Sequence, residues 1–155
     1  ATEAAGLLRT AHDREGLPQA LGIIGNCLRD LGRHQEAIDA YQEVLQVVRQ
    51  PESAPRGHLA RLAEMVVNRE IAHLHHQLGQ WRKAVDLGTA ALGMARELGH
   101  PRQVAVVLSR RAEVYVSSGD TAAAVADLRA VEQVQRETDD EAGLRRTRRR
   151  LADLR

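Results

Sequence analysis

Three histidines lie close together near the middle of the chain, in the stretch HLHH. Histidine side chains bind zinc and change charge near neutral pH. On a helix, His73 and His76 would share a face while His75 points elsewhere, and no nearby cysteine or carboxylate completes a zinc motif. We therefore predict neither a metal site nor another cofactor, and we expect His75 to take a partly buried packing position.

Cys27 is the only cysteine in the chain, which excludes an internal disulfide. A thiol can act as a nucleophile, but no histidine stands at a spacing that suggests a catalytic pair. We expect Cys27 to pack as a small hydrophobic residue. A single cysteine also fits a reducing compartment, and we expect the protein to be cytoplasmic.

A run of arginines lies near the end of the chain. Such a run can contact phosphates, but acidic residues lie on both sides of it and aromatic residues are absent there. We therefore expect a solvated helix face and no nucleic-acid binding by this domain. The chain also has no phosphate-binding glycine loop and no serine-nucleophile motif, so we do not expect an enzyme. The run comprises Arg145, Arg146, Arg148, Arg149 and Arg150.

Composition limits the fold and the partners. The 155 residues suffice for one domain, and 43% of them are hydrophobic although only 2% are aromatic. A core of small aliphatic side chains suits closely packed helices. The net charge of +1 does not select a partner. No apolar run is long enough to cross a membrane, and the first residues lack the basic start and apolar run of a signal peptide. The start at Ala1 leads us to expect a fragment of a larger protein.

Apolar residues recur at helical spacing along the whole chain, and strand-like alternation is absent. The sequence therefore predicts an all-α fold. A proline-rich loop is expected at residues 51–57, and the register of the helix that follows it is the least constrained. The predicted helices span about residues 2–15, 18–31, 35–49, 57–78, 81–98, 104–118, 121–138 and 140–154.

A repeat organises these helices. A turn glycine is followed five residues later by alanine, and then by isoleucine or valine, in three copies. Glycine permits a tight turn, and a small residue near the start of the second helix lets it approach the first. The glycines are Gly32, Gly79 and Gly119, the alanines Ala37, Ala84 and Ala124, and the matching small residues of the preceding helices Gly25, Ala72 and Ala112.

At these residues the chain resembles the tetratricopeptide repeat family, and the first unit matches best. Asn68, His75 and Gly88 in the second unit, and Arg111 in the third, depart from apolar positions of the pattern. The resemblance implies a right-handed α-solenoid of antiparallel helix pairs. We expect a single domain over residues 1–155, divided into a half-unit helix (1–16), three units (17–50, 55–98 and 100–138) and a capping helix (139–155).

In this family the first helices of the pairs line a concave groove, so the resemblance implies a protein- or peptide-binding scaffold. Guanidinium groups match carboxylates, and side-chain amides match peptide groups. The alternative at each position is a solvated charge facing an empty groove. Only Asn26 and Arg110 match the carboxylate clamp of chaperone-binding relatives, so we do not expect chaperone tails as ligands. The implied partner-binding residues are Asn26, Arg29, Arg69, His73, His76, Arg110 and Glu113.

Two other functions stay open. The repeats are similar to the sensor arms of large bacterial signalling and transcription regulators, which also contain a nucleotide-hydrolysing switch. In that case the array would act on other domains of its own parent chain. The ends of the solenoid could also join two copies into a homodimer.

Overall fold

A computed structural model of the chain describes residues 17–49 and 57–154. Within these residues it contains seven helices and no strand, which confirms the predicted all-α solenoid. The predicted helix at residues 2–15 and the proline-rich segment 51–56 lie outside the described residues. The helices are α2 (Leu17–Asp30), α3 (His34–Arg49), α4 (His58–Gln77), α5 (Trp81–Glu97), α6 (Pro101–Ser118), α7 (Thr121–Glu137) and α8 (Glu141–Asp153).

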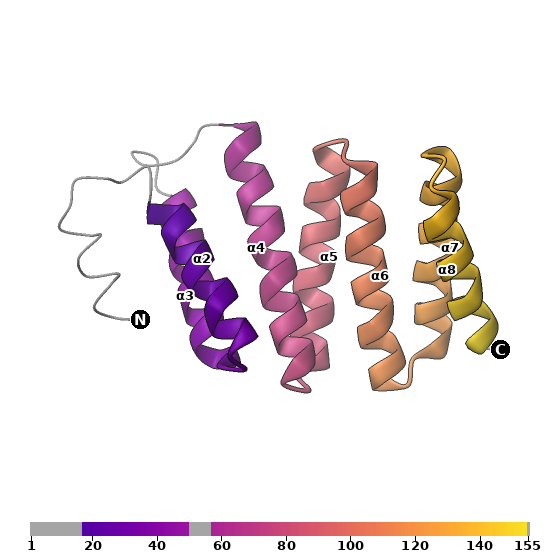
Figure 1. The fold of residues 1–155 in the computed structure, drawn as a ribbon, viewed down its shortest axis with the longest axis horizontal. Helices are drawn as coiled ribbons and strands as arrows, with labels where there is room; N and C mark the ends of the chain where they lie inside the picture. The colour runs from indigo at the N-terminus through magenta and orange to yellow at the C-terminus, as the bar shows by residue number, and fades with distance from the viewer. Residues whose placement is uncertain (1–16, 50–56, 155) are drawn as a thin grey trace.

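The helices stand side by side as an extended array (Figure 1). Each helix packs mainly against its neighbours in sequence, and the next strongest link joins α4 to α6. In the view of Figure 1, α2, α4, α6 and α8 form the layer nearest the reader, with α3, α5 and α7 behind them. This arrangement places every other helix on one continuous face.

One kind of turn ends most of these helices. Gly79 has a φ of 71°, its amide donates to the His76 carbonyl at 3.0 Å, and the Gln80 amide donates to the His75 carbonyl at 2.8 Å. Glycine is suited to this left-handed conformation because it has no Cβ. Asp139, with a φ of 54°, makes the same turn before α8. The other turn glycines are Gly32, Gly99 and Gly119.

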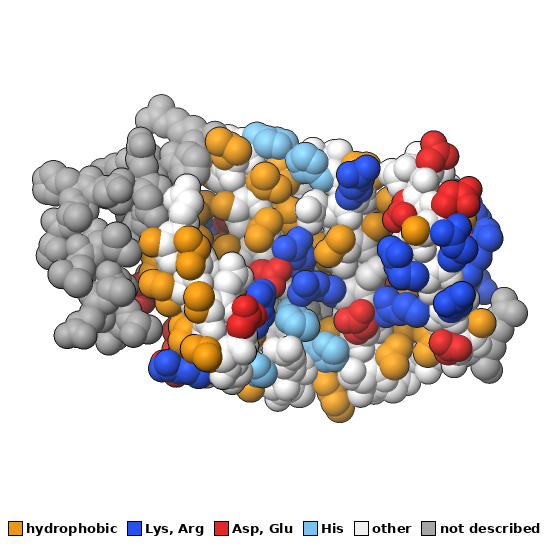
Figure 2. Space-filling view, viewed as in Figure 1, with side chains coloured by type: hydrophobic (Ala, Val, Ile, Leu, Met, Phe, Trp, Pro, Cys, Tyr) orange, Lys and Arg blue, Asp and Glu red, His pale blue; other side chains and the backbone are white. Residues whose placement is uncertain are grey.

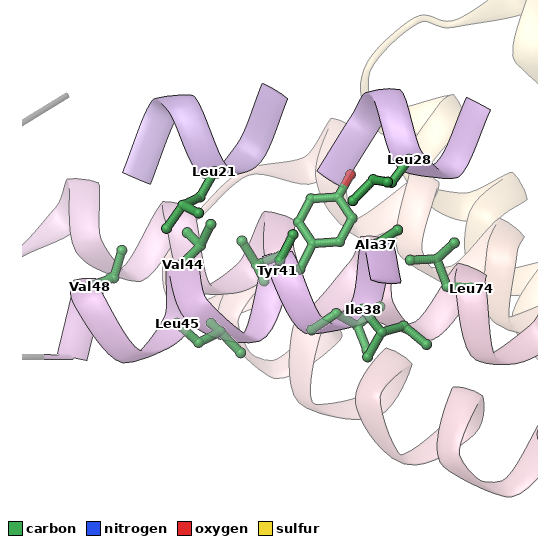
Figure 3. Packing of buried hydrophobic residues seen from close by; sticks show 12 residues of the cluster. Leu21, Leu28, Ala37, Ile38, Tyr41, Val44, Leu45, Val48 and Leu74 are labelled. Atoms are coloured by element: carbon green, nitrogen blue, oxygen red, sulfur yellow. The ribbon is translucent and has the colours of Figure 1, made fainter. Parts of the chain in front are cut away.

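The small residues of the repeat lie where helices approach each other. Ala37, Ala84 and Ala124 are fully buried. A Cβ added to Gly25 would lie 2.9 Å from the ring of Tyr41, so only glycine fits without a shift of that ring. Figure 3 shows Tyr41 among the buried aliphatic side chains of α2, α3 and α4.

The aliphatic core runs along the array in two clusters. One joins α2, α3 and α4, and the other joins α4, α5, α6 and α7. The helix α4 belongs to both, with Leu74 in the first and Met65 in the second, and it is continuous from His58. None of the described helices has the length and apolar character that crossing a membrane requires.

The prediction that Cys27 packs as a small hydrophobic residue is wrong, because its side chain is exposed. Cys27 lies on α2, the first helix of the described array. Ile23 on the same helix and Leu31 just after its end are also exposed, by 62% and 71%. The helical pattern identified apolar positions of α2 but not which of them a neighbour covers.

Candidate functional site

The seven predicted groove residues all lie on α2, α4 and α6. Figure 2 shows this face, where basic, acidic and histidine side chains gather over α4 and α6, while hydrophobic side chains dominate over α2. We call the surface formed by α2, α4, α6 and α8 the charged face. It carries Asn26 and Arg29 on α2, Arg69, Glu70, His73 and His76 on α4, Arg110 and Glu113 on α6, and Arg150 on α8.

A buried carboxylate lies at the centre of the charged face. Glu70 is only 6% exposed. Its Oε2 accepts a hydrogen bond from Arg29 Nη1 at 3.0 Å, and its Oε1 accepts two from Arg69, at 2.8 and 3.0 Å. Arg110 Nη1 lies 3.8 Å from Oε2. Three arginines, one from each repeat unit, therefore share a single carboxylate, and we call these four residues the Glu70 network.

The network keeps Glu70 ionised. Burial by itself raises the pKa of Glu70, but the hydrogen bonds from Arg69 and the charges of Arg110, Arg69 and Arg29 outweigh it, so the pKa lies below its usual value. Arg69 also donates from Nη1 to Gln103 Oε1 at 2.7 Å. Two arginines that the resemblance implied for ligand carboxylates, Arg29 and Arg69, thus already hold a carboxylate of the protein itself.

Arg110 differs from the other two arginines of the network. Its Nη1 is shielded from solvent and makes no hydrogen bond to the described residues, although it lies within ion-pair distance of Glu70. A buried donor without a hydrogen bond costs free energy. Arg110 also lines the cleft that leads from this point toward α8. Arg110 therefore keeps one N–H donor group without a hydrogen bond, whereas Arg29 and Arg69 both donate hydrogen bonds to Glu70.

His73 and His76, the two histidines of α4 on the charged face, have different surroundings. Burial lowers the pKa of His73, and the positive charge of Arg110 lowers it further. His76 Nε2 lies 2.8 Å from Ser117 Oγ, whose hydrogen is donated to the Glu113 carbonyl at 3.0 Å. The His76 ring therefore donates to Ser117. Among the described residues, no three histidine, cysteine or carboxylate side chains lie close enough together to hold a metal ion.

Asn26 marks the other end of the predicted groove. Its Oδ1 accepts a hydrogen bond from the Tyr41 hydroxyl at 2.7 Å, which joins α2 to α3. Among the described residues, Asn26 makes no side-chain hydrogen bond to the Glu70 network. The predicted set is therefore divided, with Arg29, Arg69 and Arg110 brought together and Asn26 held separately.

Two residues of the second unit that depart from the repeat pattern, His75 and Asn68, make hydrogen bonds within the fold. His75 is 8% exposed, as expected, and its Nδ1 donates to Gln80 Oε1 at 2.8 Å across the turn to α5. Burial lowers the pKa of His75. Asn68 is also buried and donates to the Met94 sulfur at 3.8 Å. These polar residues stabilise packing between α4 and α5 rather than line the charged face.

Arg111, the departure in the third unit, is held by a buried partner. Its Nε and Nη2 donate to the two carboxylate oxygens of Asp127, each at 2.8 Å, and its Nη1 donates to Thr89 at 2.8 Å. Its side-chain stem lies beside Gly88, where an added Cβ would meet Arg111 Cδ at 3.6 Å. This is an ordinary van der Waals distance, so an alanine would also fit there. The two departures, Gly88 and Arg111, therefore lie next to each other.

Beyond Arg110, the charged face continues onto α8. Arg150 lies 3.4 Å from Glu113 and donates to the Ser109 carbonyl at 3.5 Å. A cleft of about 710 Å³ opens between α6, the end of α7, and α8. Four arginines line it, namely Arg102, Arg110, Arg146 and Arg150.

Arg102, Arg146 and Arg150 were not among the predicted groove residues. A signal was present, because Arg146 and Arg150 stand four residues apart and so share a helix face. The interval from Gly99 to Asp139 also equals that from Gly79 to Gly119, so the turn before α8 keeps the repeat interval. An aspartate at the turn position concealed this regularity.

The fold and the charged face define a helical-repeat protein. Two stretches of the chain, residues 18–49 and 69–102, match models of the tetratricopeptide repeat. The chain therefore contains stretches that match the tetratricopeptide repeat, and such repeats generally mediate protein–protein interaction. A search of curated proteins found no match.

Solved structures share this fold. The crystal structure of BtubC (BKLC) from P. vanneervenii superposes with a TM-score of 0.75 at 18% sequence identity, over 98% of this chain and 60% of that chain. The apo form of RapI superposes with a TM-score of 0.81 at 11% identity, over 95% of this chain and 39% of that chain. The chain therefore spans less than two thirds of either structure, and the likeness concerns the fold.

Proposed function

We propose that the chain is a binding module for a protein or peptide, and that the ligand lies along the charged face. The observation that carries the proposal is the arrangement of α2, α4, α6 and α8 as one face with mixed polar, charged and apolar side chains. No second layer of described helices covers this face. Tetratricopeptide repeats generally act in protein–protein interaction, which supports the same function.

The ionic organisation of the face favours a preformed surface. The Glu70 network joins α2, α4 and α6, and the Arg150–Glu113 pair joins α6 to α8. A ligand then meets a surface that needs little rearrangement, which reduces the entropic cost of binding. The side chains proposed to meet the ligand are those that the resemblance implied, namely Asn26, Arg29, Arg69, His73, His76, Arg110 and Glu113.

The test compares substitutions on two sides of the array. Ile23→Glu and Val106→Glu place a charge on exposed positions of α2 and α6, which are 62% and 39% exposed. Ala126→Glu makes a comparable change at an exposed position of α7. The three variants and the parent chain would be used to capture binding proteins from cells of the source organism.

We expect the two face variants to lose partners that the α7 variant retains. Identical partner sets for all three variants would reject the charged face as the binding surface. Circular dichroism on each variant checks that the helices are intact, so that a loss reflects the surface and not unfolding.

A second candidate is an intramolecular regulatory arm, in which the array contacts other domains of a longer parent chain. The exposure of the large apolar side chains Ile23 and Leu31 near the start of the described array favours it, because such side chains are available for contact with another domain. The parent gene tests this candidate. An open reading frame without a DNA-binding or nucleotide-binding domain would eliminate it.

A further inference from the structure

We infer that the cleft between α6 and α8 binds an acidic peptide segment, whose carboxylates contact the arginines of the rim while an apolar side chain occupies the floor. This inference deepens the proposed function and rests on it, because it names the ligand chemistry of one part of the charged face. The volume of about 710 Å³ is in the range of clefts that hold ligand groups.

The arginines of the cleft supply the first argument. Arg102 and Arg146 have no carboxylate partner within the described residues, in contrast to Arg29 and Arg69. Arg110 also lines this cleft. An anionic group in the cleft would therefore face the charge of all three arginines. Carboxylates are suited to guanidinium groups because paired oxygens match paired N–H donors.

The floor of the cleft selects against a purely ionic ligand. Ala105, Val106 and Val134 line it, and Val106 remains 39% exposed. An apolar side chain on this floor would remove their surface from water. The ligand that fits therefore combines carboxylates with an apolar group, as an acidic peptide does.

Acidic residues at one end of the cleft argue against nucleic acid. Asp139 and Asp140 line the cleft beside the turn into α8. A phosphate chain that follows the arginines would approach these carboxylates and be repelled. A peptide can instead place one or two carboxylates at the arginines. Near Asp139 and Asp140 it can present uncharged groups or donate hydrogen bonds from its amides.

The wall of the cleft is fixed by internal contacts. Asp140 accepts a hydrogen bond from the Gly143 amide at 2.9 Å, and Thr147 donates to Gln135 Oε1 at 2.8 Å. Gly143 is buried, and a Cβ there would collide with the side-chain ends of Asp140 and Gln135. The glycine therefore lets these two side chains keep their hydrogen bonds. The arginines of α8 consequently project from a wall whose position is set by packing.

The experiment begins with a displayed library of random peptides selected on the parent chain. The strongest binder would be synthesised, together with a version in which asparagine and glutamine replace its acids. Calorimetry would measure both peptides on the parent chain, on Arg102→Glu/Arg146→Glu, and on Arg149→Glu. Arg149 is exposed on α8 but does not line the cleft, so its variant is matched in helix and in the kind of charge change.

We expect selected peptides to carry acids next to an apolar residue, and the amide version to bind at least about tenfold more weakly. The double variant should weaken binding at least about tenfold, while Arg149→Glu should stay within about twofold of the parent. Thermal unfolding of each variant shows whether the fold is kept.

Several outcomes would overturn the inference. These are peptides without acids, no enriched peptide, equal affinity of the double variant, or displacement of the peptide by a single-stranded oligonucleotide at a lower concentration than the unlabelled peptide needs. Failure of the proposed function is distinguishable from these. If Ile23→Glu still abolishes capture of protein partners, the charged face remains a binding surface and only the cleft assignment falls.

Discussion

Around Glu70, three arginines from three repeat units surround one buried carboxylate, whereas Arg102 and Arg146 in the cleft beside α8 have no acidic partner among the described residues. Both regions belong to the same charged face. The difference is that the first holds its own anion and the second does not. Arginine on such a face therefore has two distinct uses, one in joining repeat units and one in remaining available to a ligand.

The largest expected effect follows from removal of the shared carboxylate. Glu70→Ala removes the carboxylate that the three guanidinium groups share and leaves these positive charges close to one another. It should lower the free energy of unfolding by about 2–4 kcal/mol. Glu113→Ala removes an acid whose side chain is 47% exposed and pairs with the partly exposed Arg150, and should cost less than about 1 kcal/mol. Urea denaturation of both variants measures the contrast. Equal losses would show that the buried carboxylate shared by three arginines contributes no more to stability than a half-exposed carboxylate with one partner.

The second prediction concerns Arg111, a paired arginine outside the charged face. Asp127→Ala leaves its guanidinium without the two-point contact, and should lower the unfolding free energy by about 2–3 kcal/mol. Replacement of both partners, Arg111→Leu/Asp127→Leu, should restore most of that loss, because apolar side chains need no partner. A double variant less stable than Asp127→Ala would contradict the assignment of this pair as a purely structural one.

The third prediction uses pH. The folded pKa of Glu70 is below its unfolded value, so its contribution to stability is fully present above the unfolded pKa of about 4.3 and is lost as the pH falls through the folded pKa. The stability difference between the parent chain and Glu70→Gln should therefore be constant near neutrality and narrow in acid. Denaturation curves recorded at a series of pH values test this. A difference that widens in acid would mean that burial, and not the arginines, controls this carboxylate.

The smallest effect is expected in the cleft. Arg102→Ala and Arg146→Ala remove side chains without an ion-pair partner in the described residues, and should each change stability by no more than about 0.5 kcal/mol. Thermal unfolding is sufficient to measure this. If either variant lowers the free energy of unfolding by more than about 1 kcal/mol, that arginine stabilises the fold and is not free to bind a ligand.

Much of the fold could be predicted from the sequence because the repeat is encoded locally. Turn glycines and buried alanines fix where helices end and how closely they approach, and α5 was predicted as 81–98 against Trp81–Glu97. The helix α6 begins at Pro101 and not near residue 104, because proline is well suited to the first turn of a helix. Local signals therefore located most of the helix ends.

The ionic pairs could not be predicted in the same way. Arg29 and Glu70 are 41 positions apart, and their contact depends on how one repeat unit is placed on the next. The sequence identified Arg29, Arg69 and Arg110 as residues of one face but did not reveal that Glu70 lies among them as their common partner. Arg146 was placed on a solvated helix face for a similar reason, since its relation to α6 depends on the turn at Asp139.

The Glu70 network also bears on how the chain unfolds. In an array whose helices pack mainly against their neighbours, each unit can in principle unravel from an end without disturbing distant ones. Glu70 contacts side chains of α2 and α6 as well as its own helix, so opening either outer unit removes a partner from the central one. One carboxylate thus couples the unfolding of three units and makes that part of the array more cooperative than its helix packing alone would provide.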